Sequence, residues 1–226
     1  MSYLKRYAAP RSWQILRKEN AYVMRPSPGG HPAADSVPIG LLLKRLGHAS
    51  TTKEVGLVMR NTKVMIDGRR IRDFHFPVGI MDTISLIDAN EHYRVLIDTK
   101  ARIVLEKIDA NKAGSKPCRV LGKTVIKSGK LQLNVSDGRN IITDAKDIKV
   151  GDTVVISLPG QKITSALKLE KGARILLTAG RHAGTVGVVD EITSDRIRYT
   201  SGDESEQTLT DYAFVIPEGI MPVIPR

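Results

Sequence analysis

The feature that most limits how this chain can fold is the series of short strand-like segments that fills it from residue 82 onward. Turn signals such as Ser128-Gly129, Ser136-Asp137-Gly138 and Gly151-Asp152 separate these segments. We expect strands at 83–87, 93–98, 102–108, 119–127, 130–135, 140–143, 153–158, 173–178, 185–192, 195–199 and 212–216. Short strands at this spacing are typical of small barrels or sandwiches. Aromatic residues make up only 4% of the chain, which suits several small aliphatic cores better than one large core.

Two short helices are expected before this β-rich region. The first should span residues 39–48, where four leucines are apolar and Lys44 and Arg45 point away from them. Thr51-Thr52-Lys53-Glu54 then matches a capping box, in which the threonine oxygen accepts a hydrogen bond from a free N–H of the first turn and the glutamate reaches back. The second helix should therefore start here and run to about Arg60.

A β-hairpin should follow the second helix. Asp67-Gly68 separates the strand-like runs 64–66 and 69–72, and both turn residues tolerate positive φ. The two helices and the hairpin carry eight cations: Lys44, Arg45, Lys53, Arg60, Lys63, Arg69, Arg70 and Arg72. Aligned along one face, they would pair with the phosphates of a structured RNA, and the planar fork of arginine suits two-pronged phosphate binding.

The first 38 residues differ from the rest because they are rich in proline and glycine, so long helices and central strands are not expected there. The segment carries the cations Lys5, Arg6, Arg11, Arg17, Lys18 and Arg25. Tyr3, Tyr7, Trp13 and Tyr22 are interleaved with these charges, and such aromatics either stack on bases or anchor a segment to its own domain. We interpret the segment as a basic RNA-binding arm; the alternative is a solvated tail.

The basic charge is concentrated in the first part of the chain. The net charge is +11, and residues 1–80 hold 14 Lys/Arg against five Asp/Glu, whereas residues 81–226 hold 21 against 19. A surface this basic attracts polyanions such as nucleic acid or acidic lipid headgroups. The uneven distribution favours a localised binding face over a general solubilising charge.

Enzymatic chemistry finds little support in the residues. The five histidines are scattered and lack paired cysteines, so no metal site is expected. Gly122-Lys123-Thr124 resembles the end of a phosphate-binding loop, but Pro117 stands where that loop needs a glycine. Cys118 would be a nucleophile only beside a positioned base, and is interpreted as a small core residue. We therefore expect no catalytic residue, no cofactor and no small-molecule substrate.

The compartment follows from what the sequence lacks. A single cysteine cannot form an internal disulfide. The sequence contains no stretch of about 18 apolar residues, so no membrane span is expected. The first residues, 1–6, do not have the apolar run of a signal peptide. A cytoplasmic protein without a membrane partner is the expectation.

The order of two helices and a hairpin resembles the S-four-type RNA-binding domain. Longer motifs resemble the archaeal and eukaryotic ribosomal protein S-four-e (S4e) family. They are Leu4-Lys5-Arg6 with Ala8-Ala9-Pro10 and Trp13, the segment 25–31, Asp67 to Asp73, Phe76 to Ser85, 97–102 and 148–153. Phe76 to Ser85, read with the 67–73 turn, is the most specific of them, and the likeness covers essentially the whole chain. Eukaryotic relatives carry a longer basic tail, so an end at Arg226 favours an archaeal-like member.

Residues 172–180 and 184–189 look like a KOW motif, whose glycines allow tight turns and a close approach of the backbone to a partner. Arg181 and His182 lie at its turn and are expected to contact RNA. The resemblance thus implies an α+β, mainly β chain. Its parts are an N-terminal arm (1–38), an S-four-type RNA-binding unit (39–92), a central β-domain (93–170) and an SH3-like KOW barrel (171–226).

By this resemblance the protein would bind 16S-type rRNA, contact neighbouring small-subunit proteins, and support subunit assembly and translation in the cytoplasmic ribosome. Two alternatives stay open. An RNA-modifying enzyme, such as a pseudouridine synthase with a similar RNA-binding unit, would need a much larger catalytic domain after residue 90 and would show pseudouridylation activity. A KOW-containing transcription elongation factor would associate with RNA polymerase, but would leave the first 100 residues unexplained.

Overall fold

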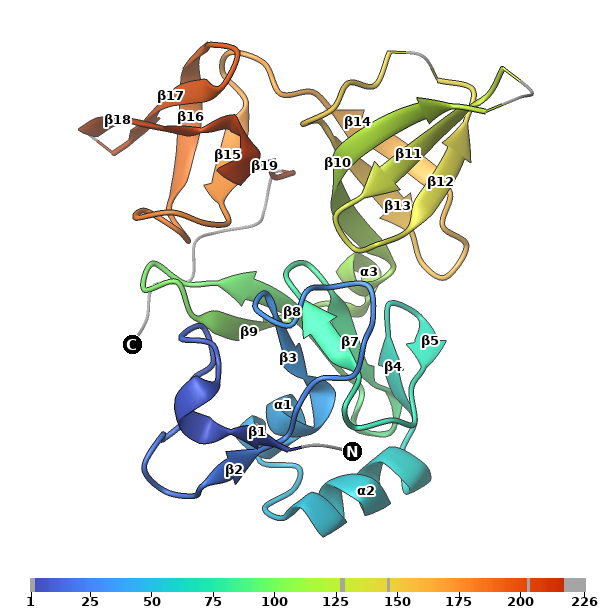
Figure 1. Cartoon of the computed structure of the whole chain (residues 1–226). Coiled ribbons are helices and arrows are strands. Elements are labelled where there is room, and N and C mark those ends of the chain that lie inside the picture. The colour runs from blue at the N-terminus through green and yellow to red at the C-terminus, as the bar shows by residue number, and fades with distance from the viewer. Residues whose placement is uncertain (1–2, 127–128, 146, 203, 218–226) are drawn as a thin grey trace. The chain divides into compact units, whose positions relative to one another are not determined.

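The structure is a computed structural model that describes residues 3–126, 129–145, 147–202 and 204–217. Strands dominate it, and the described residues contain three α-helices (Figure 1). The chain divides into two compact units, which we treat separately. The first unit comprises Met1–Leu96 and Arg102–Gly114, and the second comprises Ile97–Ala101 and Ser115–Arg226. The expectation of a mainly β chain with a few helices is confirmed.

The first unit combines the three helices with three small sheets. Its helices are α1 (Ile39–Arg45), α2 (Thr52–Asn61) and α3 (Ala110–Ala113). One two-stranded sheet pairs β1 (Leu4–Lys5) with β2 (Tyr22–Val23), and another pairs β3 (Ser36–Pro38) with β6 (Pro77–Gly79). The five-stranded sheet has the order β5-β4-β7-β8-β9, from β4 (Val64–Ile66), β5 (Arg69–Arg70), β7 (Thr83–Leu86), β8 (Glu91–Ile97) and β9 (Ile103–Ile108).

One hydrophobic core holds the first unit together, and the N-terminal segment contributes to it. Val55 and Met59 of α2, spaced i and i+4, are fully buried in this core. Trp13 joins the same core at 4% exposure, and its indole Nε1 donates a hydrogen bond of 2.8 Å to the carbonyl of Ser36. Burial of an indole ring with its N–H satisfied is strongly favourable, so this segment is anchored to the domain at that point.

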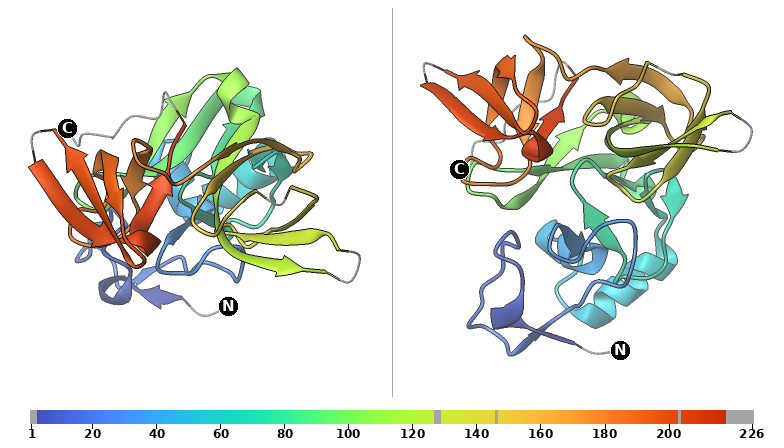
Figure 2. Two further views of the ribbon diagram at one scale, coloured as in Figure 1. Left: turned by 90° about the horizontal axis from the view of Figure 1, so that it is seen from above. Right: turned by 45° about the horizontal axis from the view of Figure 1, so that its top comes forward.

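The second unit contains two five-stranded antiparallel sheets, each with its own core. The first sheet has the order β12-β11-β10-β13-β14 and curls around its core (Figure 2). It is formed by β10 (Ser115–Val125), β11 (Leu131–Val135), β12 (Asn140–Thr143), β13 (Thr153–Ser157) and β14 (Ile163–Leu167). Leu131, Leu133 and Val135 alternate inward, as the two-residue period of a strand requires.

The second sheet of this unit has the order β18-β17-β16-β15-β19. It is formed by β15 (Arg174–Leu177), β16 (Val186–Ile192), β17 (Arg196–Ser201), β18 (Glu204–Leu209) and β19 (Ala213–Val215). Ile197 and Tyr199 of β17 are fully buried in its core, whereas Arg196 and Arg198 lie on the outer side. The alternation in the sequence Arg-Ile-Arg-Tyr therefore sets which side chains reach solvent.

Both predicted helices and the predicted hairpin are present, but several strands were missed. The first helix ends three residues earlier than expected, at Arg45, just before Gly47 takes a φ of 81°. β14 and β18 were missed because they are edge strands with mostly exposed side chains and carry no regular apolar alternation. β10 starts four residues before the prediction, at Ser115; Pro117 is tolerated because residues 115–119 pair only with β13, and pairing with β11 begins at Val120.

Candidate nucleic-acid interface

The β4–β5 hairpin is held in place by its turn. Asp67 and Gly68 have φ values of 51° and 74°, the left-handed geometry that was predicted from the Asp-Gly pair. Asp67 Oδ1 also accepts hydrogen bonds from the backbone N–H and the hydroxyl of Thr83, at 3.0 and 3.2 Å. The turn is thus tied to β7, and the two residues that follow it, Arg69 and Arg70, are both exposed.

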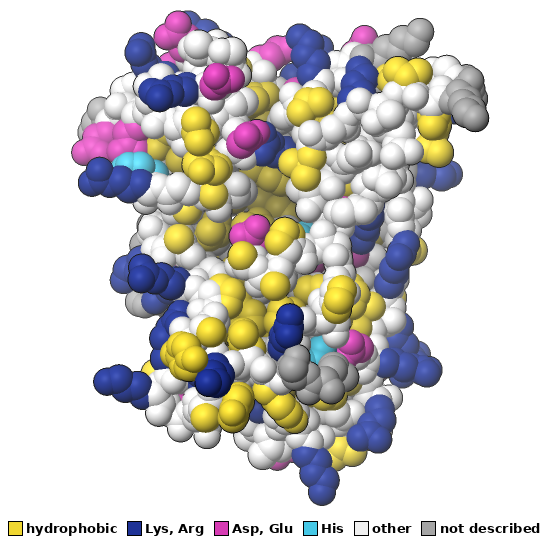
Figure 3. Space-filling view, viewed as in Figure 1, with side chains coloured by type: hydrophobic (Ala, Val, Ile, Leu, Met, Phe, Trp, Pro, Cys, Tyr) yellow, Lys and Arg dark blue, Asp and Glu magenta, His cyan; other side chains and the backbone are white. Residues whose placement is uncertain are grey.

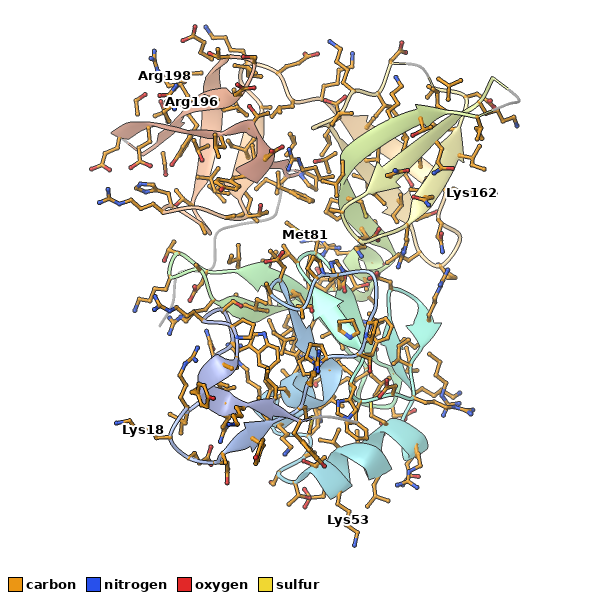
Figure 4. All side chains as sticks on the ribbon, viewed as in Figure 1. Lys18, Lys53, Met81, Lys162, Arg196 and Arg198 are labelled. Atoms are coloured by element: carbon orange, nitrogen blue, oxygen red, sulfur yellow. The ribbon has the colours of Figure 1, made fainter. Side chains whose placement is uncertain are left out.

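Helix α2 lies next to this hairpin and begins at the predicted capping box. Thr51 Oγ1 accepts a hydrogen bond from the Glu54 N–H, and the Glu54 carboxylate accepts bonds from the Ser50 and Thr51 N–H groups. These bonds, the one from Ser50 first, lower the pKa of Glu54. The cap fixes the start of the helix, and with it the direction of the exposed Lys53 (Figure 4).

Two exposed arginines, Arg60 and Arg70, come together where α2 and the hairpin meet. Arg60 Nε donates to the carbonyl of Gly56 at 3.0 Å, and Arg70 Nη2 approaches the carbonyl of Arg60 at 3.4 Å. These contacts bring the end of the helix to the second hairpin strand. We define the hairpin surface as the exposed side chains Lys53, Arg60, Lys63, Arg69, Arg70 and Arg72.

The segment 25–31 packs against residues 73–82, which follow the hairpin in the sequence. The carbonyl of Arg25 lies 2.7 Å from Nδ1 of His75, and Ser27 Oγ donates to Asp73 at 3.0 Å. His31 Nε2 lies 3.0 Å from Asp82 Oδ1, and the His31 ring fills the space that a Cβ on Gly79 would need. The motifs 25–31 and 73–82, which are distant in the sequence, therefore contact each other in the first unit.

The other predicted cations of the first unit have more varied environments. Arg17 donates to the carbonyls of Tyr7, Ala9 and Pro10 at 2.8, 3.0 and 3.2 Å, so it braces the N-terminal segment internally. Arg6 forms an ion pair of 2.9 Å with Glu19. By contrast, exposed side chains are found at Lys5, Arg11, Lys18 and Arg25, and Figure 4 shows Lys18 directed away from the fold.

Two cations on α1, Lys44 and Arg45, lie beside a groove. Lys44 Nζ lies 3.1 Å from Thr52 Oγ1, and Arg45 Nη1 donates to the carbonyl of Ile103 at 2.7 Å. Both line a groove that also contains Trp13. The structure therefore separates the eight cations predicted for this unit into a hairpin surface and a pair beside a groove.

In the second unit, the side chain of Arg181 is exposed, whereas that of His182 contacts a carboxylate. His182 Nδ1 lies 3.1 Å from the carboxylate of Glu206, which also accepts a hydrogen bond from the Tyr199 hydroxyl. Burial, and then the Glu206 carboxylate, raise the pKa of Tyr199. Sequence reasoning did not single out the outward-facing Arg196 and Arg198 of β17, although their alternation with apolar residues was a usable signal (Figure 4).

A metal-binding cluster and Cys118 are the two other candidates for chemistry. None of them form a cluster of three or more His, Cys, Asp or Glu side chains able to hold a metal ion. Cys118 is buried in the core of the second unit, and its Sγ lies 3.6 Å from Asp137 Oδ2. None of the described helices is long and apolar enough to cross a membrane.

The fold defines a mainly β protein, and its exposed lysines and arginines form the kind of surface that polyanions bind. Residues 89–163 match the family described as "Ribosomal family S4e", and residues 3–34 match the "RS4NT (NUC023) domain". The chain belongs to the ribosomal protein S4e family, as its motifs predicted.

Relatives and a solved structure support this membership over most of the chain. The small ribosomal subunit protein eS4 of Methanosphaera stadtmanae is 39% identical over 229 residues, which cover 98% of this chain and 94% of that protein. The protein of the same name from Aeropyrum pernix is 38% identical, covering 94% and 90%. The crystal structure of the 30S ribosomal protein S4e from Thermoplasma acidophilum is 30% identical and superposes with a TM-score of 0.69, covering 82% of this chain and 95% of that one.

Proposed function

We propose that this protein is a structural component of the small ribosomal subunit, where it binds 16S-type rRNA and supports assembly and translation without catalysing a reaction. The observation that carries the proposal is the hairpin surface, where α2, the hairpin and the residues that flank its strands carry six exposed cations. Its relatives are named small-subunit proteins, and the similarity extends over nearly their whole length, which supports a place in the small ribosomal subunit. Its partners would be rRNA and neighbouring small-subunit proteins in the cytoplasmic ribosome.

The proposal assigns a role to each part of the chain. The order α1, α2, β4, β5 supports an S-four-type unit in residues 39–92. The curled sheet after residue 114 supports a central β-domain in 93–170, and the five strands after it support a KOW barrel in 171–226. The N-terminal segment, 1–38, would present Lys5, Arg11 and Lys18 to RNA while Trp13 anchors it.

The mechanism is neutralisation of phosphate charge. Each phosphate that a lysine or arginine neutralises releases bound counterions, so the affinity falls as the salt concentration rises. Arg69 and Arg70 are suited to bind phosphate oxygens with both prongs of the guanidinium, because their side chains are exposed directly after a fixed turn. Selectivity would come from the shape of the RNA and from contacts to 2′-hydroxyl groups and unstacked bases.

A salt titration of rRNA binding tests this function. The full chain is mixed with small-subunit rRNA, and the association constant is measured by filter binding at several salt concentrations. We expect tight binding whose logarithm falls linearly and steeply with the logarithm of the salt concentration. Binding that is weak at low salt, or that does not depend on salt, would remove phosphate neutralisation by exposed cations as the mechanism.

A further inference from the structure

A groove of about 590 Å³ opens in the first unit, beside the two N-terminal strands β1 and β2 and helix α1. Its floor is apolar and belongs to the domain core; it includes Trp13, Val23, Met24 and Leu42. Figure 3 shows hydrophobic side chains interspersed with lysines and arginines over this part of the molecule. The groove lies apart from the hairpin surface, since none of the six cations that define that surface lines it.

Two tyrosines form an aromatic wall on the rim. The rings of Tyr3 and Tyr22 have centroids 6.3 Å apart and planes inclined by 57°. Tyr3 is 68% exposed and Tyr22 is 57% exposed, so ring surface remains open to a ligand. Each exposed ring offers a π-face on which a flat heterocycle can stack, and such stacking does not depend on which base is present.

The charges at the groove favour an anion. Arg6, Lys44 and Arg45 line it together with a single carboxylate, Glu19, which already pairs with Arg6 at 2.9 Å. Three cations against one carboxylate leave the lining with a net positive charge, which an anionic ligand would balance.

Polar groups that can read a base are also present. The amides of Gln14 and Asn20 line the groove and are exposed, and each offers both a donor and an acceptor. An apolar floor, an aromatic wall, amides and an excess of cations match the parts of a nucleotide, which are a flat base, polar edges and a phosphate. An apolar peptide segment would bring no negative charge to balance the net positive charge of the lining.

We infer that this groove binds an unpaired nucleotide of RNA. The base lies against Tyr3 and Tyr22 over the apolar floor, and its phosphate lies beside Lys44 and Arg45. A base within a double helix could not enter, because its faces are already stacked, so the groove selects a bulged, looped or terminal nucleotide. This inference rests on the proposed function and adds to it the kind of RNA element that the N-terminal segment recognises.

Trp13 provides a direct test, because it is the single tryptophan of the chain and lies in the floor of the groove. The full chain is titrated with unstructured hexamers of adenosine or uridine while tryptophan emission is followed. We expect a saturable change in emission. Replacing both rim tyrosines, Tyr3→Ala with Tyr22→Ala, should weaken association at least fivefold, the lower range for removing a base–aromatic stack.

Tyr7 supplies a matched control. It is 71% exposed and belongs to the same N-terminal segment, but it does not line the groove. Tyr7→Ala should leave hexamer binding within twofold of the unchanged protein. An equal loss in this variant and in the double variant would overturn the inference, because the effect would then come from the segment in general.

Cross-linking of the unchanged protein keeps the test independent of how the variants fold. A hexamer carrying 5-iodouridine should cross-link to peptides that contain Tyr3, Trp13 or Tyr22. Cross-links confined to other peptides, or no change in tryptophan emission, would overturn the inference. If rRNA binding and its salt dependence persist in that case, only the groove inference fails; if rRNA binding is itself absent, the proposed function fails as well.

Discussion

The hairpin surface of the first unit and the core of the second unit use the same kinds of charged residue in opposite ways. Arg69 and Arg70 are exposed on a short hairpin. Lys116, by contrast, is 1% exposed, and its Nζ lies 3.0 Å from Asp137 Oδ2. Arg139 Nε approaches the same carboxylate oxygen at 3.2 Å. We call Lys116, Asp137 and Arg139 the buried ion cluster.

The difference lies in what surrounds the charges. An exposed cation keeps its hydration and is ready to exchange water and counterions for phosphate, while it adds little to stability. A buried charge has lost its hydration, so it depends on its partner. Burial alone would raise the pKa of Asp137, but the charges and hydrogen bonds of Lys116 and Arg139 outweigh it and hold that pKa below its usual range.

This comparison teaches that net charge alone does not locate a binding surface. The second unit contains many lysines and arginines, and some of them stabilise the fold from inside. Only the cations that the fold leaves exposed and gathers together are suited to bind RNA. Substitutions in the two regions should therefore separate stability from binding.

The largest effect is expected for Asp137→Asn in the buried ion cluster. This change keeps the shape but removes the negative charge that Lys116 Nζ contacts at 3.0 Å, and breaking such a buried pair costs about 3 kcal/mol of the free energy of unfolding. Urea unfolding at pH 7 measures it. Asp144→Asn, at an exposed acid of the same region, is the control and should change stability by less than about 0.5 kcal/mol. Equal effects would contradict the account of the cluster.

Lowering the pH should remove part of the same stabilisation. Because the pKa of Asp137 is lower in the folded protein than in the unfolded chain, its contribution is complete above about pH 4 and is lost as the pH falls through the folded pKa. The unchanged protein should therefore lose more stability than Asp137→Asn does between pH 5 and pH 2.5. Parallel curves for the two proteins would show that Asp137 is not the titrating group.

On the hairpin surface, the double change Arg69→Ala with Arg70→Ala should affect binding and spare stability. Removing two phosphate contacts should weaken rRNA binding about tenfold and reduce the magnitude of the salt slope by about 1 to 2. Filter binding over a range of salt concentrations measures both quantities. The matched control is Lys168→Ala with Lys171→Ala, an exposed pair between β14 and β15, which should leave affinity and slope unchanged. If affinity and slope stay unchanged in the hairpin variant, the hairpin is not part of the interface.

A smaller effect is expected at the helix cap. Thr51→Ala removes the oxygen that accepts a hydrogen bond from the Glu54 N–H, and loss of such a cap costs about 1 kcal/mol of the free energy of unfolding. Thr52→Ala, at the first residue of the helix itself, is a nearby comparison. Thermal unfolding followed by circular dichroism measures both. A loss no greater in Thr51→Ala than in Thr52→Ala would show that the capping box does not stabilise α2.

Local patterns predicted local structure well. The Thr51–Glu54 capping box and the Asp67-Gly68 turn each depend on neighbours within a few residues, and the structure contains both. The edge strands β14 and β18 were not predicted, because their mostly exposed residues follow no regular apolar alternation. Both strands are found only through their backbone pairing, of β14 with β13 and of β18 with β17.

Contacts between residues far apart in the sequence could not be predicted. Lys116 and Asp137 are 21 positions apart, and nothing in either flank shows that both are buried. The aromatic residues of the N-terminal segment were equally suited to stack on bases or to anchor the chain. The structure places Trp13 in the core and leaves Tyr3 and Tyr22 exposed on the rim of a groove.

The most direct test of the central claim is the position of the protein in a sucrose gradient. A native lysate is fractionated in high salt, and the protein is quantified in each fraction by mass spectrometry. The account predicts a stoichiometric amount in the small-subunit peak, because a structural component stays within the folded subunit while high salt removes loosely bound proteins. Finding the protein only among free proteins, or together with RNA polymerase, would contradict it.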